Sequence, residues 1–137
     1  MPRLARWMIR TALVYLVLAL LAGILLGLRG AAGWDWVPDG LTPVYFHLYM
    51  VGWASLLIFG VAYWMFPKYT QVRPRGSEPL GWAVYGLVNA GLVLRVLGES
   101  LSGQSPVWGW VLVVSALLLW LGGVAFVLNT WPRVKEK

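Results

Sequence analysis

The sequence predicts an all-α membrane protein, a bundle of four antiparallel transmembrane helices. Hydrophobic residues make up 60% of the 137 residues and charged residues only 12%, whereas a soluble domain is about 45–50% apolar and about 25% charged. The mean hydropathy is +0.72. Four apolar runs are each long enough to cross a bilayer, which takes roughly 20 residues, and the short loops between them favour antiparallel neighbours. This composition excludes a water-soluble fold.

The four predicted spans cover residues 7–28, 44–66, 80–98 and 107–128. No internal repeat or second domain interrupts them, so we expect a single transmembrane domain over residues 1–137. The first run is too long for the apolar segment of a signal peptide and lacks a small-residue cleavage site. We therefore expect it to be retained as a span.

The basic residues predict the orientation in the membrane. Nine of the eleven fall on one side of the predicted spans: Arg3, Arg6, Arg10, Lys68, Arg73, Arg75, Arg133, Lys135 and Lys137. Only Arg29 and Arg95 are left for the other side, together with Asp35, Asp39 and Glu99. Because loops rich in Lys and Arg stay in the cytoplasm, both termini are predicted to be cytoplasmic.

The composition also argues against several classes of ligand, namely nucleic acid, Fe–S clusters and zinc. The formal net charge is +6, but the basic residues flank the apolar runs, so they indicate membrane topology and a lipid partner rather than nucleic acid. The chain has no cysteine, which excludes disulfides, Fe–S clusters and thiolate metal sites. One histidine and five carboxylates offer too few ligands for a zinc site.

The candidate site lies in the second run, PVYFHLYMVGWASLLIFGVAYWMFP, from Pro43 to Pro67. A proline at each end is typical of a helix boundary. The only histidine, His47, lies about one turn inside the first boundary and so near one membrane face, the outer one in the predicted orientation. An ionisable group inside a span is costly and is by default a candidate functional residue.

The surroundings of His47 suit a flat cofactor. At α-helical spacing its face also carries Met50, Val51, Ala54, Ile58 and Val61. Ala54 and nearby Gly52 leave room beside an imidazole, as a macrocycle requires, and neutral imidazole is a strong axial ligand of haem iron. The alternative is a histidine hydrogen-bonded to a neighbouring carbonyl or hydroxyl, for which Tyr45, Tyr49 and Ser55 are candidates.

Other polar and small residues have several interpretations. Arg95, at the depth of His47, could pair with a haem propionate, pair with Glu99 at i,i+4, or extend to the interface. Asn89, deep in the third span, is expected to anchor an interhelical hydrogen bond. Two pairs of small residues predict close packing between helices or between copies of the chain: Gly23 with Gly27, and Gly86 with Ala90.

The segment HLYMVGWASLLIFGVAYWMFP, residues 47–67, resembles the second transmembrane helix of haem-copper oxidase catalytic subunits. It is most similar in style to cbb3-type oxidases and nitric oxide reductases. In that family a histidine at the outer end of this helix ligates the low-spin haem, and a Gly-x-x-Tyr and a proline follow near the inner end. The matching positions are His47, Gly60, Tyr63 and Pro67. The resemblance implies that His47 is an axial ligand of haem b.

The chain departs from the family in its ligands, because it lacks the second low-spin ligand, the copper-binding histidines and the proximal histidine. Catalytic reduction of oxygen or nitric oxide is therefore not expected. We expect a small b-type haem protein for electron transfer or for sensing NO or O₂, in the cytoplasmic (inner) membrane of a prokaryote. The sixth ligand would be Met50, Met65, solvent, nothing, or His47 of another protomer in a homodimer. Without a CxxCH motif, covalent c-type attachment is excluded.

Two alternatives stay open. One is a non-catalytic accessory or assembly subunit of a respiratory oxidase or nitric oxide reductase complex, in which His47 is structural. The other is a haem or copper delivery protein, with Met8, Met50 and Met65 as soft ligands beside His47.

Overall fold

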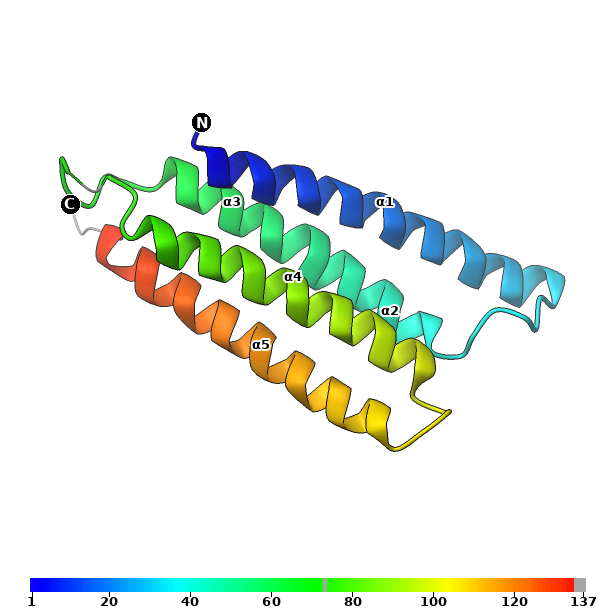
Figure 1. Ribbon diagram of the computed structural model, residues 1–137. Helices are drawn as coiled ribbons and strands as arrows, with labels where there is room; N and C mark the ends of the chain where they lie inside the picture. The colour runs from blue at the N-terminus through cyan, green and yellow to red at the C-terminus, as the bar shows by residue number, and fades with distance from the viewer. Residues whose placement is uncertain (73, 135–137) are drawn as a thin grey trace.

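The computed structural model describes residues 1–72 and 74–134, and these residues form helices and loops but no strand. Four helical segments are long and apolar enough to cross a membrane: Arg3–Ala32, Leu41–Met65, Glu78–Leu101 and Val107–Arg133. They run antiparallel, so that the first segment begins and the fourth ends at the same end of the bundle, here named the terminal end (Figure 1). The opposite end is the distal end. The predicted all-helical architecture with four membrane-length helices is confirmed.

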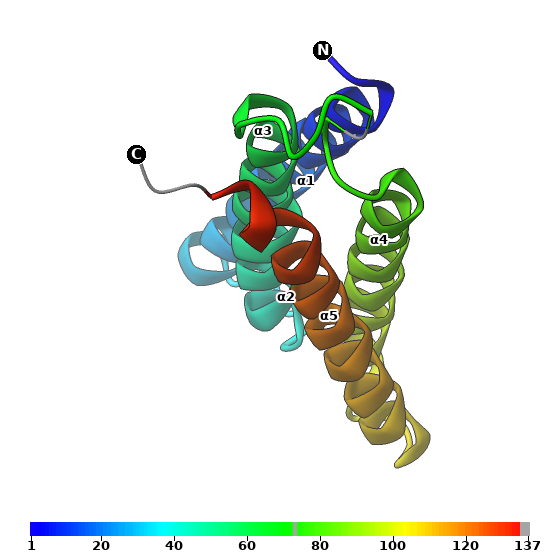
Figure 2. The ribbon, with the colours of Figure 1, turned by 90° about the vertical axis from the view of Figure 1, so that its left-hand side faces the viewer.

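The second segment is built from three consecutive helical pieces. The first and third segments are single α-helices, and the fourth is an α-helix that ends in a short 3₁₀ turn. In chain order the elements are α1 (Arg3–Ala32), α2 (Leu41–His47), η1 (Leu48–Ser55), α3 (Leu56–Met65), α4 (Glu78–Leu101), α5 (Val107–Thr130) and η2 (Trp131–Arg133). The elements form two hairpins, one from α1 with α2–η1–α3 and one from α4 with α5, which Figure 2 shows from the terminal end.

Helix ends agree with the positions of the prolines. Pro43 lies in the first turn of α2, and α3 ends at Met65, followed by Phe66 in an extended conformation with φ −63° and ψ 150°. This follows from Pro67, because a proline disfavours helical geometry at the residue before it. α1 is longer than its predicted span. At 1.5 Å per residue its 30 residues extend about 45 Å, beyond a hydrocarbon core of about 30 Å.

The middle of the second span differs from the prediction. η1 is a π-helix, with i→i+5 backbone bonds, and it starts directly after His47. The hydroxyl of Ser55 donates to the carbonyl of Met50, five residues earlier. Because α-helical spacing does not hold across η1, the predicted face of His47 is not continuous. Met50 is 57% exposed, whereas Val51 packs against the buried clusters of the core.

Small residues set the close contacts within each hairpin. A Cβ atom at Gly60 would lie 3.0 Å from Cβ of Met8, so α3 approaches α1 closely there. Between α4 and α5, Gly91 and Gly98 pack against leucines of α5, and Ser115 donates to the carbonyl of Gly91 at 2.7 Å. Close approach at small residues is the usual way for helices to pack in lipid.

Most residues of the predicted small-residue pairs do not lie at these close contacts between helices. Gly23 packs against the ring of Tyr45 within the first hairpin, but Gly27 and Gly86 have no neighbour within 4 Å of an added Cβ atom. Ala90 is exposed as well. Gly86 and Ala90 therefore do not mediate packing within the chain.

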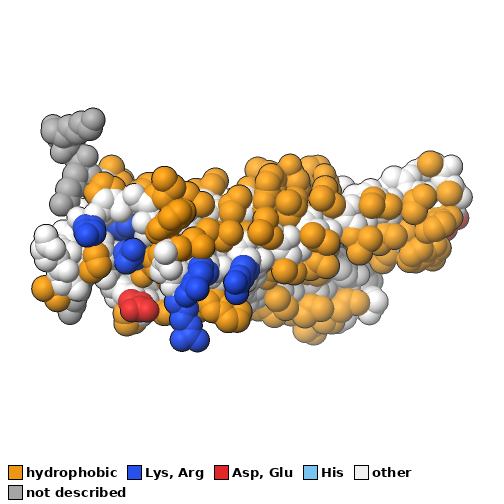
Figure 3. Space-filling view, turned by 90° about the horizontal axis from the view of Figure 1, so that it is seen from above, with side chains coloured by type: hydrophobic (Ala, Val, Ile, Leu, Met, Phe, Trp, Pro, Cys, Tyr) orange, Lys and Arg blue, Asp and Glu red, His pale blue; other side chains and the backbone are white. Residues whose placement is uncertain are grey.

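Polar side chains connect the helices. Tyr15 of α1 donates to Asn89 of α4 at 2.7 Å, which confirms Asn89 as an interhelical anchor. At the terminal end, Asn129 accepts from the backbone N–H of Ser77, just before α4. Basic side chains gather at the terminal end, while hydrophobic side chains cover most of the remaining surface in the view of Figure 3.

Arg133, one of the nine basic residues on the predicted cytoplasmic side, is buried in the protein. Its side chain is only 1% exposed. Its guanidinium donates to the carbonyl oxygens of Tyr63 at 3.1 Å, Phe66 at 2.8 Å and Pro67 at 3.1 Å. These carbonyls lie at the end of α3, where a helix leaves acceptors unpaired. Arg133 therefore caps α3. Three other basic residues of that count, Arg73, Lys135 and Lys137, lie outside the described residues.

Candidate functional site

The site is built around His47, the last residue of α2, whose side chain is 32% exposed. Its Nδ1 atom lies 2.9 Å from the carbonyl oxygen of Pro43, four residues earlier on the same helix. The same nitrogen lies 2.9 Å from Oε1 of Glu99, near the end of α4. Since a carbonyl and a carboxylate both accept, the hydrogen-bond network assigns the proton to Nδ1. The neutral imidazole then carries its lone pair on Nε2.

Glu99 is buried, with 8% of its side chain exposed. It reaches His47 because α2 and α4 approach closely at the distal end. A Cβ atom at Gly40, the residue before α2, would overlap the backbone carbonyl of Glu99. Oε2 of Glu99 is also buried and has no hydrogen-bond partner among the described residues. Glu99 thus contacts the imidazole of His47 through Oε1, while Oε2 has no other partner that would draw the carboxylate away.

The pairing of Glu99 with His47 was not predicted from the sequence, in which Glu99 was a candidate partner only for Arg95. The signal was present, because both side chains are ionisable and lie at the same depth of neighbouring predicted spans. Charged groups inside a membrane generally pair with one another.

Arg95 lies one helical turn before Glu99 and is half-buried. It interacts electrostatically with Glu99, but the two form no ion pair within the part of the chain that the structure describes. Its Nε atom is buried without a hydrogen-bond partner there. The predicted i,i+4 ion pair is thus not formed, and the guanidinium keeps donors for another acceptor.

The residues predicted to flank His47 differ in how exposed they are. Met50 is exposed and Ala54 is half-buried, both in η1. Gly52 does not leave room beside the imidazole, because a Cβ atom there would lie 2.8 Å from Tyr15 and 2.9 Å from Leu92. The space beside Gly52 is filled by side chains of α1 and α4 that pack against η1.

The predicted hydroxyl partners of His47 are also not used. The Ser55 hydroxyl bonds to the backbone, and the rings of Tyr45 and Tyr49 stack on one another. Of the alternatives considered for a hydrogen-bonded histidine, the structure has a carbonyl, that of Pro43.

Neither methionine suits a sixth ligand within one chain. Met65 lies at the other end of the second span, 18 residues from His47, a distance of about 27 Å along a helix. Met50 follows His47 by three residues on the same helical segment, so one chain would have to supply both ligands from the same side of the site. Met8 is buried in the core at the terminal end, so the soft ligands of a delivery protein are not brought together.

The donor set at His47 fits one axial position of a haem, and no more. A metal-ligating histidine usually donates its other ring N–H to a carbonyl or a carboxylate, and His47 has both partners on Nδ1. The described residues contain no group of three or more His, Asp or Glu side chains that could hold a metal ion by themselves. Exposed apolar side chains on the second span, including Phe46 and Met50, would form one wall of such a site.

No protein-family model, curated protein or solved structure matches this chain.

Proposed function

We propose that this chain is a small b-type haem-binding membrane protein with Nε2 of His47 as the axial ligand. The observation that carries the proposal is the pair of acceptors on Nδ1, which fixes the tautomer and the orientation of the ring. A bound haem supplies reversible one-electron chemistry and an iron site for diatomic gases. The function that follows is electron transfer or sensing of NO or O₂.

In this proposal the chain's own residues have separate tasks. Glu99 orients His47 and raises the basicity of its free nitrogen, as carboxylates behind metal-ligating histidines do. Arg95, one helical turn before Glu99 on α4, would supply guanidinium donors to a propionate. Met50 and Ala54 contribute to the wall beside the ring. With one histidine per chain, we do not propose reduction of oxygen or nitric oxide.

The haem proposal is tested by the haem content and spectra of purified variants. We expect His47→Ala to insert normally and to lose haem. Glu99→Gln keeps a hydrogen-bond acceptor for Nδ1–H but loses the charge, so we expect it to bind haem about 10–100-fold more weakly. Glu78→Gln, an exposed carboxylate at the terminal end, is the matched control and should bind haem like the unchanged chain.

Two results would contradict the proposal. A His47→Ala protein with full haem content and an unchanged spectrum would exclude His47 as the ligand. A colourless unchanged protein that co-purifies with an oxidase or nitric oxide reductase complex would favour the accessory-subunit function.

We further propose a homodimer, since two-fold symmetry would supply a second His47. The uncovered notches at Gly27 and Gly86 offer surfaces for close contact between copies. One haem per two chains with a bis-imidazole spectrum would support a shared haem. One haem per chain with rapid binding of carbon monoxide would instead indicate an open sixth position and gas sensing.

For the orientation, we propose cytoplasmic termini in the inner membrane of a prokaryote, supported by the nine-to-two split of basic residues. The chain has no cysteine, so a single introduced thiol gives an unambiguous label. Trp36→Cys, at an exposed position between α1 and α2, should react with an impermeant thiol reagent from outside the cell. Lys68→Cys, after α3, is the opposite-side control. Labelling of position 36 only from the cytoplasm would reverse the orientation.

A further inference from the structure

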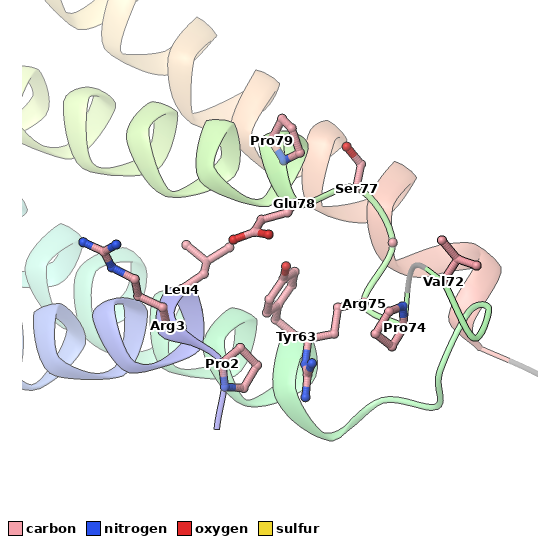
Figure 4. Close-up of a pocket in the computed structure, with 11 residues that line it drawn as sticks. Pro2, Arg3, Leu4, Tyr63, Val72, Pro74, Arg75, Ser77, Glu78 and Pro79 are labelled. Atoms are coloured by element: carbon pink, nitrogen blue, oxygen red, sulfur yellow. The ribbon is translucent and has the colours of Figure 1, made fainter.

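A cavity of about 410 Å³ opens at the terminal end (Figure 4), and His47 is not among its lining residues. It lies between the start of α1, the end of α3 and the loop that leads into α4. Its lining residues are Pro2, Arg3, Leu4, Tyr63, Val72, Pro74, Arg75, Gly76, Ser77, Glu78 and Pro79. Its volume falls within the range of about 300–1,000 Å³ that is typical of small-molecule sites.

The cavity has charges of both signs on different walls. In Figure 4 the Tyr63 hydroxyl and the Glu78 carboxylate point toward one another, whereas the Arg75 guanidinium lies toward Pro2. Neither Arg75 nor Glu78 forms an ion pair with another described residue. One wall is therefore suited to an anion and the other to a cation.

Arg75 lacks an acceptor that its burial requires. Its Nε atom is buried and has no hydrogen-bond partner within residues 1–72 and 74–134. A buried donor without an acceptor is costly, and guanidinium groups pair strongly with phosphate oxygens. Nε itself is closed to a ligand, so an anionic oxygen that enters the cavity would bind the other N–H groups of the Arg75 guanidinium.

The position of the cavity identifies the source of such a ligand. It lies where the membrane-length helices end and where basic side chains gather, next to a surface that is otherwise apolar (Figure 3). This is the level of lipid headgroups. A phosphoethanolamine headgroup carries a phosphate and an ammonium that still has N–H donors, which match the two walls.

We propose that this cavity binds the headgroup of phosphatidylethanolamine, with Arg75 on the phosphate and Glu78, assisted by the Tyr63 hydroxyl, on the ammonium. The acyl chains extend along the apolar surface of the helices. The site is independent of haem and of which side of the membrane the terminal end faces.

The test is native mass spectrometry of the full chain in detergent with an equimolar mixture of phosphatidylethanolamine, phosphatidylcholine and phosphatidylglycerol. The unchanged chain should retain phosphatidylethanolamine preferentially. Arg75→Gln should weaken binding of all three lipids about tenfold, the usual effect of losing a charged hydrogen bond. Glu78→Gln should remove only the preference for phosphatidylethanolamine. Arg10→Gln, an exposed arginine of α1 outside the cavity, is the matched control and should bind like the unchanged chain.

Three outcomes would overturn the proposal. Equal losses in Arg75→Gln and Arg10→Gln would mean that only the general positive charge attracts lipid. Unchanged binding in Arg75→Gln, with helicity retained in circular dichroism, would exclude the cavity. If soluble O-phosphoethanolamine binds as tightly as the lipid, the ligand is a free metabolite rather than a membrane component.

Discussion

Replacing Arg133 with methionine is expected to lower the free energy of unfolding by about 3 kcal/mol. The change removes three hydrogen bonds from a charged donor and leaves the carbonyls of Tyr63, Phe66 and Pro67 without that partner. Each such bond contributes about 1.5–3 kcal/mol. Nη1 of Arg133 is buried without a partner, so the net contribution is smaller than the sum of the three.

The measurement is reversible unfolding in detergent micelles, followed by tryptophan fluorescence. Arg133→Lys retains the charge but not the planar fork of donors, so we expect it to recover only part of the loss. Arg10→Met removes an exposed arginine and should change stability by no more than about 0.5 kcal/mol. If Arg133→Met were as stable as Arg10→Met, the cap on α3 would have no energetic importance.

Gly40→Ala is also expected to lower the free energy of unfolding by about 3 kcal/mol and to disrupt the site around His47. The added methyl group would overlap the backbone carbonyl of Glu99, and a backbone atom cannot move away as a side chain can. α2 would have to separate from α4, which breaks the contact between His47 and Glu99. We therefore expect weaker haem binding together with the loss of stability.

Gly30→Ala is the control for this substitution. Gly30 also lies at the distal end, inside α1, and an added Cβ atom there has no neighbour within 4 Å. Alanine is favoured over glycine inside a helix by roughly 0.5–1 kcal/mol, so this variant should be equal or more stable. Similar unfolding curves for the two variants would contradict the close approach of α2 and α4.

The number and approximate position of the spans followed from the sequence, because membrane spans are long, apolar and bounded by charges or prolines. Which helix faces pack together could not be predicted in the same way. In lipid both the core and the exterior are apolar, so residue size rather than polarity decides the contacts. Gly91 and Gly98 face α5, whereas Gly86, which was predicted to mediate close packing, faces outward.

The candidate site was predicted in part. The position of His47 near the start of the second helical segment followed from its distance to Pro43, and Pro43 also supplies the carbonyl for Nδ1. The pairing with Glu99 depends on the close approach at Gly40, which joins residues about 50 positions apart. The π-helix at Leu48–Ser55 was not predicted, because an apolar run does not distinguish i→i+5 from i→i+4 backbone bonding.

The cap on α3 has a consequence for biosynthesis. Arg133 bonds to carbonyls that precede it by 66 to 70 residues, and the two helices of the second hairpin lie between them in the chain. During translation the first hairpin enters the membrane with the last acceptors of α3 still lacking this donor. Only after α4 and α5 have been synthesised does Arg133 reach them. The cap on α3 therefore joins the second hairpin to the first and can form only after both hairpins have been synthesised.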